Sequence, residues 1–486
     1  MRDDGMKLNW KNEKNLGMLV DLYELTMTNG YLVNEVDHYW VYFDYFFRRV
    51  PDHGGFAITA GLEQFLDYVL NLQFTKDDLD FIRSMNLFTS EFIEYLKDFR
   101  FSGDIWAIPE GTPVFPNTPI VTVRAPLLEA QLIETMLLLT LNHQSLIATK
   151  ANRIVRAANG KPVVDFGARR AHGADAANFG ARACYIGGCF GTSNVLASKM
   201  FNIPAIGTMA HSWIQFFDSD RLAFDAYVKA YPKQVTLLVD TYNVLKSGVP
   251  QAIEVFKNMQ LGSKKGIRID SGDLGYLSRR ARKMLDDSGF QDTTITVSNA
   301  LDEYRIRELE IQKAPINFYG VGERMITARS EAVFGGVYKL VALENNGKKM
   351  SRIKLSEEAD KITNPGFKEV WRLYDNNNGN AFADLITFKN EEVKEPYKLF
   401  DPISPWKSKE AKNFTAKKLQ KKMVENGVLV AKLPTLEEIR ENLKVEMAKL
   451  WDDLLRFESP DRYFVNLSYE LWVEKQNLID KYRMHQ

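Results

Sequence analysis

Cysteine, net charge and long apolar runs are all scarce in this sequence of 486 residues, and each absence excludes a class of protein. Two cysteines cannot build a disulfide framework, which favours a reducing compartment. The 63 lysines and arginines balance the 63 aspartates and glutamates, whereas proteins that bind the nucleic-acid backbone carry a basic excess. We therefore expect no nucleic acid among the partners.

The apolar stretches are interrupted by acidic residues such as Asp21, Glu24 and Glu129. None approaches the roughly 18 clean residues that a membrane span needs. Residues 1–14 are charged and contain no apolar signal core. We expect a cytoplasmic protein without membrane contact, and 45% hydrophobic residues supply its packed core.

The chain divides by pattern into three parts. Residues 1–150 predict an N-terminal α+β domain, in which the apolar stretch that begins at Pro126 favours one helix. Residues 151–340 predict an α/β unit with the active site, and residues 341–486 a C-terminal α+β segment that packs with the N-terminal domain. The lysine-rich stretch 407–422 is interpreted as a solvated helical face or loop.

The middle part has a regular rhythm of short apolar runs that each end in a small or polar residue. The runs end at positions 165, 208, 240, 270, 298 and 320, and most gaps are close to the roughly 30 residues of a βαβ unit. Parallel strands that are buried on both faces read as continuous apolar runs of this kind. The pattern predicts a (β/α) barrel or a doubly wound sheet.

The residues at these run ends are unusually rich in polar chemistry. In a barrel the carboxyl ends of the strands form the active-site face. The residues that the pattern places there are Asp165, Thr208, Asp240, Asp270, Ser298, Gly320 and Gly322. We expect an active site at this edge.

His211 follows Gly207 and Thr208 at the expected start of a helix, and helix N-termini favour anions. Two interpretations stay open on these residues alone: a phosphate-binding or phosphorylated histidine, and a histidine beside a capping Ser212. The glycine pairs 320/322 and 335/336 fit either phosphate-binding backbone or ordinary tight turns. A P-loop motif is absent from the sequence.

Several strings, taken in order, resemble the nicotinate phosphoribosyltransferase family of type II phosphoribosyltransferases. They are 21–27 (DLYELTM), 43–48 (FDYFFR), 165–170 (DFGARR), 207–212 (GTMAHS), 268–273 (RIDSGD), 298–299 (SN) and 335–340 (GGVYKL). The resemblance implies an irregular α/β barrel with an additional domain built from both chain ends. It also implies a homodimer with active sites shared between subunits.

The resemblance implies transfer of phosphoribose from phosphoribosyl pyrophosphate to nicotinate in NAD salvage, giving nicotinate mononucleotide and pyrophosphate, coupled to hydrolysis of the co-substrate ATP with Mg²⁺. In that likeness, His211 is the phosphorylated histidine, and Asp240 and Asp270 contact ribose hydroxyls or Mg²⁺. Further substrate-binding residues are implied at Tyr23 (from the partner subunit), Phe166, Arg169, Ser193, Thr208, Arg268, Ser298, Gly320, Gly322, Arg329, Gly335 and Gly336. The metal ligands are left unassigned.

Substrate choice is expected to depend on Ser193. The related nicotinamide enzyme carries an Asp at the matching place, which would repel a carboxylate substrate, so Ser193 favours nicotinate. Glu323 departs from the family pattern, because some members carry Thr there. The alternatives are a nicotinamide or quinolinate phosphoribosyltransferase, and a non-catalytic module that binds phosphorylated metabolites.

Overall fold

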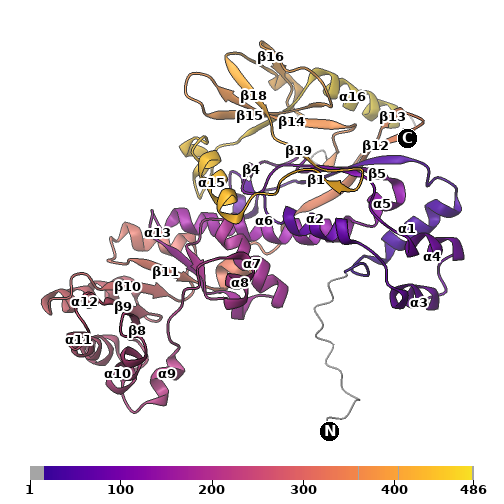
Figure 1. Ribbon diagram of the computed structural model, residues 1–486. Helices are drawn as coiled ribbons and strands as arrows, with labels where there is room; N and C mark the ends of the chain where they lie inside the picture. The colour runs from indigo at the N-terminus through magenta and orange to yellow at the C-terminus, as the bar shows by residue number, and fades with distance from the viewer. Residues whose placement is uncertain (1–15, 359–360, 403, 484–486) are drawn as a thin grey trace, which may run out of the picture.

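The computed structural model describes residues 16–358, 361–402 and 404–483 (Figure 1). Three sheets dominate it: a seven-stranded antiparallel sheet, a six-stranded parallel sheet and a four-stranded sheet near the C-terminus. Figure 1 shows the parallel sheet and its helices to one side of the other two sheets. In the part of the chain that the structure describes, no helix is long and apolar enough to cross a membrane.

The seven-stranded sheet combines strands from both ends of the chain, in the order β13-β12-β1-β5-β3-β19-β20. Its strands are β1 (Trp40–Phe47), β3 (Asp104–Ala107), β5 (Val121–Pro126), β12 (Gly336–Asn345), β13 (Lys348–Ser351), β19 (Lys421–Glu425) and β20 (Val428–Leu429). Strand β1 lies in the middle, where Tyr45 pairs with Tyr338 of β12 and with Val121 of β5. The N-terminal and C-terminal segments therefore share one sheet, while the exact domain boundaries stay a prediction.

Helices of the N-terminal part pack on and beside this sheet. They are α1 (Leu22–Val33), α2 (Leu62–Asn71), α3 (Lys76–Ser84), α4 (Ser90–Lys97), α5 (Leu127–Gln131) and α6 (Glu134–Ala157), with the turn η1 (Pro51–His53) and the short strands β2 (Ala57–Ile58) and β4 (Pro113–Val114). The prediction of a single helix after Pro126 is wrong, because two helices occupy this stretch: α5 ends at Gln131 and α6 begins at Glu134. The 24-residue α6 then leads into the parallel sheet.

The parallel sheet has the order β7-β6-β11-β10-β9-β8. Its strands are β6 (Val163–Asp165), β7 (Gly191–Thr192), β8 (Gln234–Leu238), β9 (Lys264–Ile269), β10 (Thr294–Ser298) and β11 (Phe318–Val321). The first and last strands are neighbours, with Val163 beside Tyr319, so the sheet curls into an incomplete barrel. This confirms the predicted α/β unit with an irregular, barrel-like parallel sheet.

The prediction is wrong for one of the six expected strands, the run that ends at Thr208. The run that ends at Thr208 makes a single bridge, from Ala205 to Thr192, because Pro204 has no backbone N–H for a ladder. The two-residue strand β7 takes its place in the sheet. The helices and short turns of this part are η2 (Ala168–Arg170), α7 (Ala174–Ile186), α8 (Val195–Phe201), α9 (His211–Phe216), α10 (Asp220–Ala230), η3 (Val244–Gly248), α11 (Val249–Lys257), α12 (Leu274–Asp287), α13 (Glu303–Ile311) and α14 (Glu323–Ile326).

The C-terminal part holds the four-stranded sheet in the order β18-β14-β15-β21. Its elements are β14 (Lys368–Asp375), β15 (Ala381–Phe388), β16 (Tyr397–Leu399), η5 (Pro405–Lys407), β17 (Lys409–Ala411), β18 (Phe414–Lys418), α15 (Leu436–Met447), η6 (Asp452–Leu455), β21 (Phe464–Leu467) and α16 (Tyr469–Arg483). The lysine-rich stretch forms β17, β18 and the start of β19, so the helical alternative for it is wrong.

Candidate active site

Six polar side chains, one of them an arginine, come together at the carboxyl-end edge of the parallel sheet. We call Thr208, His211, Asp240, Arg268, Asp270 and Ser298 the strand-end cluster. Arg268 lies near the end of β9 and donates from Nε to Ser298 Oγ at 2.9 Å, from Nη1 to Thr208 Oγ1 at 2.7 Å, and from Nη2 to Asp270 Oδ1 at 3.0 Å. Ser298 Oγ also donates to Asp270. One arginine fork thus joins the ends of β9 and β10 to the segment that precedes α9.

His211 is the first residue of α9, and its ring contacts a buried carboxylate. His211 Nε2 lies 3.2 Å from Asp240 Oδ1, and the side chain of Asp240 is fully buried while 38% of the His211 side chain is exposed. Asp240 Oδ2 accepts from the backbone N–H of Asp270 at 3.0 Å and from Ser271 Oγ at 2.5 Å. With two donors fixed on Oδ2, Oδ1 is the acceptor left for an Nε2–H of the imidazole. That tautomer leaves Nδ1 with the free lone pair.

Phe166 follows β6 and lies against two other predicted site residues. The Arg268 guanidinium carbon is 5.5 Å from the centre of the Phe166 ring. A Cβ on Gly320 would lie 2.4 Å from Phe166 Cε2, so only glycine at that position leaves room for the ring. A half-buried aromatic face beside a cluster of polar groups is suited to stacking a flat heterocycle.

Asp165 is a support for this edge of the sheet. Its side chain is buried and accepts from Gly167 N at 2.8 Å and Thr192 Oγ1 at 2.7 Å, which joins the end of β6 to β7. Burial raises the pKa of Asp165, and the two hydrogen bonds counter that effect. These bonds position the backbone on both sides of Phe166.

Arg169 and Ser193 lie on the exposed rim of the same edge. Arg169 is in η2, three residues after Phe166, and no carboxylate among the described residues pairs with its guanidinium. Ser193 directly follows β7, and its backbone N–H donates to Asp165 O at 2.8 Å. Both side chains are exposed and available to a ligand.

We call residues 322–335, which lead from β11 to β12, the connector. Arg329 lies in it with a 63% exposed side chain, and its Nη1 is 2.7 Å from Glu323 Oε1. Glu323 is the first residue after Gly322, so this ion pair holds the guanidinium at the carboxyl end of β11. The carboxylate of Glu323 is therefore already matched to a cation inside the chain.

Gly335, the last residue of the connector, and Gly336, the first residue of β12, differ in how closely they are packed. Gly336 begins β12 and pairs with Phe47, and a Cβ there would lie 2.1 Å from Asn142 Oδ1 on α6. Gly335 has open space where a Cβ would be. Gly336 thus serves close packing, and a role of either glycine at phosphate stays a prediction.

Tyr23 is not brought to the strand-end cluster within one chain. It lies on α1 with 41% of its surface exposed, and Figure 1 shows α1 far from strands β8 to β10. Burial and the nearby carboxylates of Glu134 and Glu24 raise the pKa of its phenol. Tyr23 is therefore uncharged at physiological pH, and its role as a stacking residue stays a prediction.

The carboxylates of the cluster differ in what they leave open for a metal ion. Both oxygens of Asp240 are engaged, whereas Asp270 Oδ2 has no hydrogen-bond donor among the described residues. No group of three or more His, Cys, Asp or Glu side chains in the described part of the chain is arranged to hold a metal. The donor set fits Mg²⁺ that is held mainly by ligand phosphates with one carboxylate.

The sequence did not reveal the role of Ser271, nor the partner of Glu323, which it singled out only as a departure from the family pattern. Ser271 donates to Asp240, and Glu323 pairs with Arg329. Ser271 directly follows Asp270, so its position beside the acids was the available signal. The partner of Glu323 lies six residues further on, across a connector whose course the sequence does not indicate.

Comparison with known proteins covers almost the whole chain. Family models described as nicotinate phosphoribosyltransferase (NAPRTase) N-terminal domain, nicotinate phosphoribosyltransferase (NAPRTase) family and nicotinate phosphoribosyltransferase C-terminal domain match residues 18–142, 162–363 and 367–475. The nicotinate phosphoribosyltransferase of Bacillus subtilis is 41% identical over 472 residues, which cover 96% of each chain. That of Dictyostelium discoideum is 35% identical over 522 residues, covering 95% of this chain and 88% of the relative. The crystal structure of human nicotinic acid phosphoribosyltransferase matches with a TM-score of 0.83 and 28% identity, over 95% of this chain and all of that one.

Proposed function

Because the chain belongs to the nicotinate phosphoribosyltransferase family, we propose that it transfers phosphoribose from phosphoribosyl pyrophosphate to nicotinate and couples this transfer to ATP through phosphorylation of His211. The observation that carries the coupling is the 3.2 Å contact between His211 Nε2 and the buried Asp240, inside the strand-end cluster. The products are nicotinate mononucleotide and pyrophosphate, so the reaction serves NAD salvage.

The transfer step is a substitution at C1 of the ribose. The ring nitrogen of nicotinate supplies its lone pair to C1, the bond from C1 to the pyrophosphate oxygen breaks, and pyrophosphate leaves with that electron pair. Positive charge develops on the ribose, and the carboxylates of Asp240 and Asp270 stabilise it electrostatically. Phe166 stacks on the pyridine ring, and Gly320 leaves room for this arrangement.

The anionic groups of the substrates meet cations at the rim. Arg169 is unpaired by carboxylates in the described chain, and Arg329 exchanges its contact with Glu323 for a substrate carboxylate or phosphate. Arg268 acts differently, because its guanidinium is already used by Thr208, Asp270 and Ser298. Its role is to hold these three side chains in place for the ribose and phosphate.

Phosphorylation of His211 uses the tautomer that Asp240 sets. The Nδ1 lone pair forms a bond to the γ-phosphorus of ATP, the bond to the β–γ bridging oxygen breaks, and ADP leaves. Asp240 stabilises the positive imidazole ring that results, through the Nε2–H it accepts. Water then cleaves the phosphohistidine, and this hydrolysis drives the transfer toward product.

Asp270 is the residue that would hold Mg²⁺ beside the phosphates, through its free Oδ2. The ion, when bound, neutralises the charge on the leaving pyrophosphate. Thr208 and the exposed backbone of Gly207 flank the same place and suit phosphate oxygens.

A homodimer completes this site in our proposal. The exposed apolar side chains of α1 and the residues before it (Leu16, Leu19, Leu22, Tyr23, Met27 and Val33) form a face suited to a second copy. Such a partner would bring its Tyr23 to the free face of the pyridine ring opposite Phe166. We propose the cytoplasm as the location of the enzyme, in keeping with its free, buried cysteines.

The decisive experiment combines a product assay with a labelling assay. Release of pyrophosphate from phosphoribosyl pyrophosphate and nicotinate is measured with and without ATP, and the protein is incubated with γ-labelled ATP. His211→Ala should abolish the acid-labile label and the stimulation by ATP, while slow ATP-independent transfer remains. His38→Ala, an exposed histidine bonded to Glu35 O, is the matched control. Unchanged labelling of His211→Ala would remove this residue from the mechanism.

A further inference from the structure

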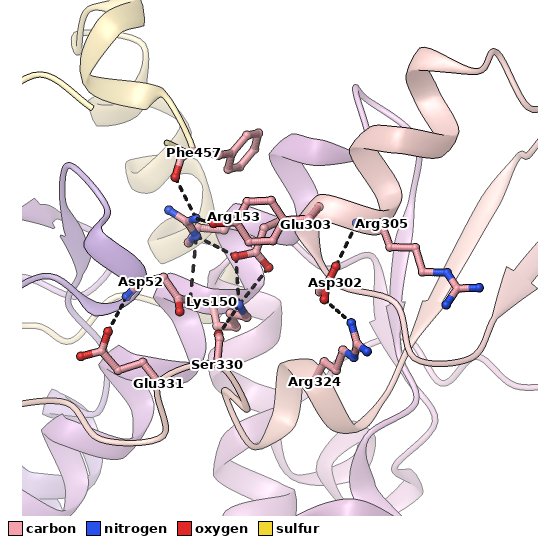
Figure 2. A network of polar contacts seen from close by, with 11 residues as sticks. Asp52, Lys150, Arg153, Asp302, Glu303, Arg305, Arg324, Ser330, Glu331 and Phe457 are labelled. Carbon is pink, nitrogen blue, oxygen red and sulfur yellow. Dashed lines mark hydrogen bonds and ion pairs between the residues drawn. The ribbon is translucent and has the colours of Figure 1, made fainter. Parts of the chain in front are cut away.

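A buried ion cluster lies behind the connector, and the proposed reaction makes no use of it (Figure 2). It consists of Asp52, Lys150, Arg153 and Glu303. Lys150 Nζ lies 2.9 Å from Asp52 Oδ2, 2.9 Å from Glu303 Oε1 and 2.7 Å from Ser330 Oγ, so each of its three protons has an acceptor. Only 3% of the Lys150 side chain and none of the Glu303 side chain is exposed.

The cluster joins three separate parts of the chain. Lys150 and Arg153 come from α6, Asp52 from η1, and Glu303 from the first turn of α13 beside the parallel sheet. Arg153 Nε donates to Glu303 Oε1 at 2.9 Å, which gives the buried carboxylate a second cation. Because a buried ion group is costly unless every partner is present, this arrangement strongly specifies the relative position of its members.

The connector is fixed to the cluster at two successive residues. Ser330 accepts from Lys150, and Glu331 accepts from the backbone N–H of Asp52 at 2.7 Å. Glu331 also pairs with Arg49 at 2.5 Å. Figure 2 shows Ser330 and Glu331 directed toward Lys150 and Asp52.

The other end of the connector is fixed to the same helix that supplies Glu303. Arg324 of α14 pairs with Asp302, which caps α13 by accepting from Arg305 N at 2.9 Å. Between the two anchors, Ala328 adopts φ 43°, a left-handed conformation that costs a residue with a Cβ about 1–2 kcal/mol. A strained residue between two anchored ends indicates that the anchors determine the course of the chain.

Arg329 follows this strained residue and immediately precedes Ser330. With Ser330 held inward, the side chain of Arg329 is left exposed and reaches the carboxyl end of β11 through Glu323. We propose that Lys150 is a positioning residue, which acts through Ser330 to hold Arg329 at the active-site rim for an anionic substrate group. Only the identity of that anion, either the nicotinate carboxylate or a phosphate, depends on the proposed function.

Ser330→Ala is the informative variant, because it removes one hydroxyl and leaves the ion cluster intact. Lys150→Met would leave Asp52 and Glu303 without their shared cation, and we expect it to unfold more readily. Thr149→Ala is the matched control: Thr149 is the neighbouring buried residue of α6, and its hydroxyl accepts from Ile58 N at 2.9 Å without touching the connector. KM and kcat are measured for both substrates in each variant, alone and combined with Arg329→Met.

We expect Ser330→Ala to raise KM five- to tenfold for the substrate whose KM Arg329→Met raises, with kcat changed less than twofold. In the Arg329→Met background Ser330→Ala should have no further effect, since the residue that it positions is gone. Thr149→Ala should lower the melting temperature without changing either KM. Full additivity of the Ser330 and Arg329 effects, or an equal KM change in Thr149→Ala, would overturn the proposal.

Hydrogen exchange separates this inference from the proposed function. Backbone amides of residues 322–335 should exchange faster in Ser330→Ala than in the unsubstituted protein and in Thr149→Ala, with no substrate present. A protein that shows no transfer at all would refute the proposed reaction, while the exchange result would still decide whether Ser330 holds the connector. Equal exchange in all three proteins would refute the positioning role.

Discussion

The replacement Asp240→Asn tests the phosphohistidine step at its most sensitive point. In the structure Asp240 Oδ2 accepts from Asp270 N and Ser271 Oγ, and Oδ1 faces His211 Nε2. An asparagine must keep its carbonyl oxygen toward the two fixed donors, which turns its NH₂ group toward His211. The imidazole then has to accept at Nε2 and carry its proton on Nδ1, the atom that should attack ATP.

The size of the effect follows from two losses. The charge-assisted hydrogen bond between Asp240 and the positive imidazole is worth about 1.5–3 kcal/mol, or roughly 10- to 150-fold in rate. The inverted tautomer adds to this, since the same Asp-to-Asn change beside a catalytic histidine costs roughly 10⁴-fold in a serine protease. We expect phosphorylation of His211 to slow by about 10²- to 10⁴-fold.

The assay is a single-turnover measurement of acid-labile phosphate on the protein after mixing with γ-labelled ATP. Asp273→Asn is the control, because Asp273 lies three residues after Asp270 but caps α12, accepting from Tyr276 N at 2.9 Å. It should label at the rate of the unsubstituted protein. If Asp240→Asn also labels at that rate, Asp240 does not set the tautomer and the mechanism proposed for His211 is wrong.

Three further variants examine other parts of the molecule. Gly320→Ala places a Cβ 2.4 Å from the Phe166 ring. KM for nicotinate should rise more than tenfold in steady-state assays, while the circular dichroism spectrum is unchanged. An unaltered KM would exclude stacking of nicotinate on Phe166. Ser193→Asp adds a negative charge at the rim, and its repulsion of the nicotinate carboxylate at about 4 Å would cost roughly 1–4 kcal/mol. The preference for nicotinate over nicotinamide should therefore fall at least fivefold in competition assays. An unchanged ratio would place Ser193 away from the substrate. Glu24 is buried, which raises its pKa from 4.5 to about 7, so the folded state keeps its proton at a pH where the unfolded chain has lost it. Stability is therefore lost as pH rises from about 4.5 to 7, by about 3 kcal/mol. Urea unfolding of Glu24→Gln at pH 5 and pH 8 should lack this decline, and an identical decline would assign it to another group.

Most of the parallel sheet was predictable because its strands are apolar runs, and the later ones, from β8 to β11, are spaced by about one helix each. The prediction of a strand at 203–208 was wrong because Pro204 was counted within an apolar run, although its missing N–H was an available signal against a ladder. Strand β7 was missed because two residues, one of them glycine, carry no pattern. The break between α5 and α6 was hidden by continuous apolar character across Leu132 and Ile133, which are both buried.

The site was predictable where its residues end a strand or follow it directly, as Ser298 and Asp270 do. Parallel pairing then brings such residues together without further information. The partners of Lys150 could not be read in this way, because Asp52 and Glu303 lie 98 and 153 residues away in different elements. The pairing of Arg329 with Glu323 likewise depends on the left-handed turn at Ala328. Contacts of this kind depend on the folded course of the chain.

The central place of β1 in the seven-stranded sheet has a consequence for the order of folding. Its pairing with β12 joins residues about 300 positions apart, so this contact has a high loop-closure cost while the intervening chain is unfolded. The parallel sheet lies entirely between β5 and β12, and its first and last strands are neighbours. Once β6 and β11 have paired, the two ends of this long insertion are adjacent, and β12 needs to search only the length of the connector to find β1. We therefore expect the catalytic part to form first and the sheet that unites both chain termini to assemble around it.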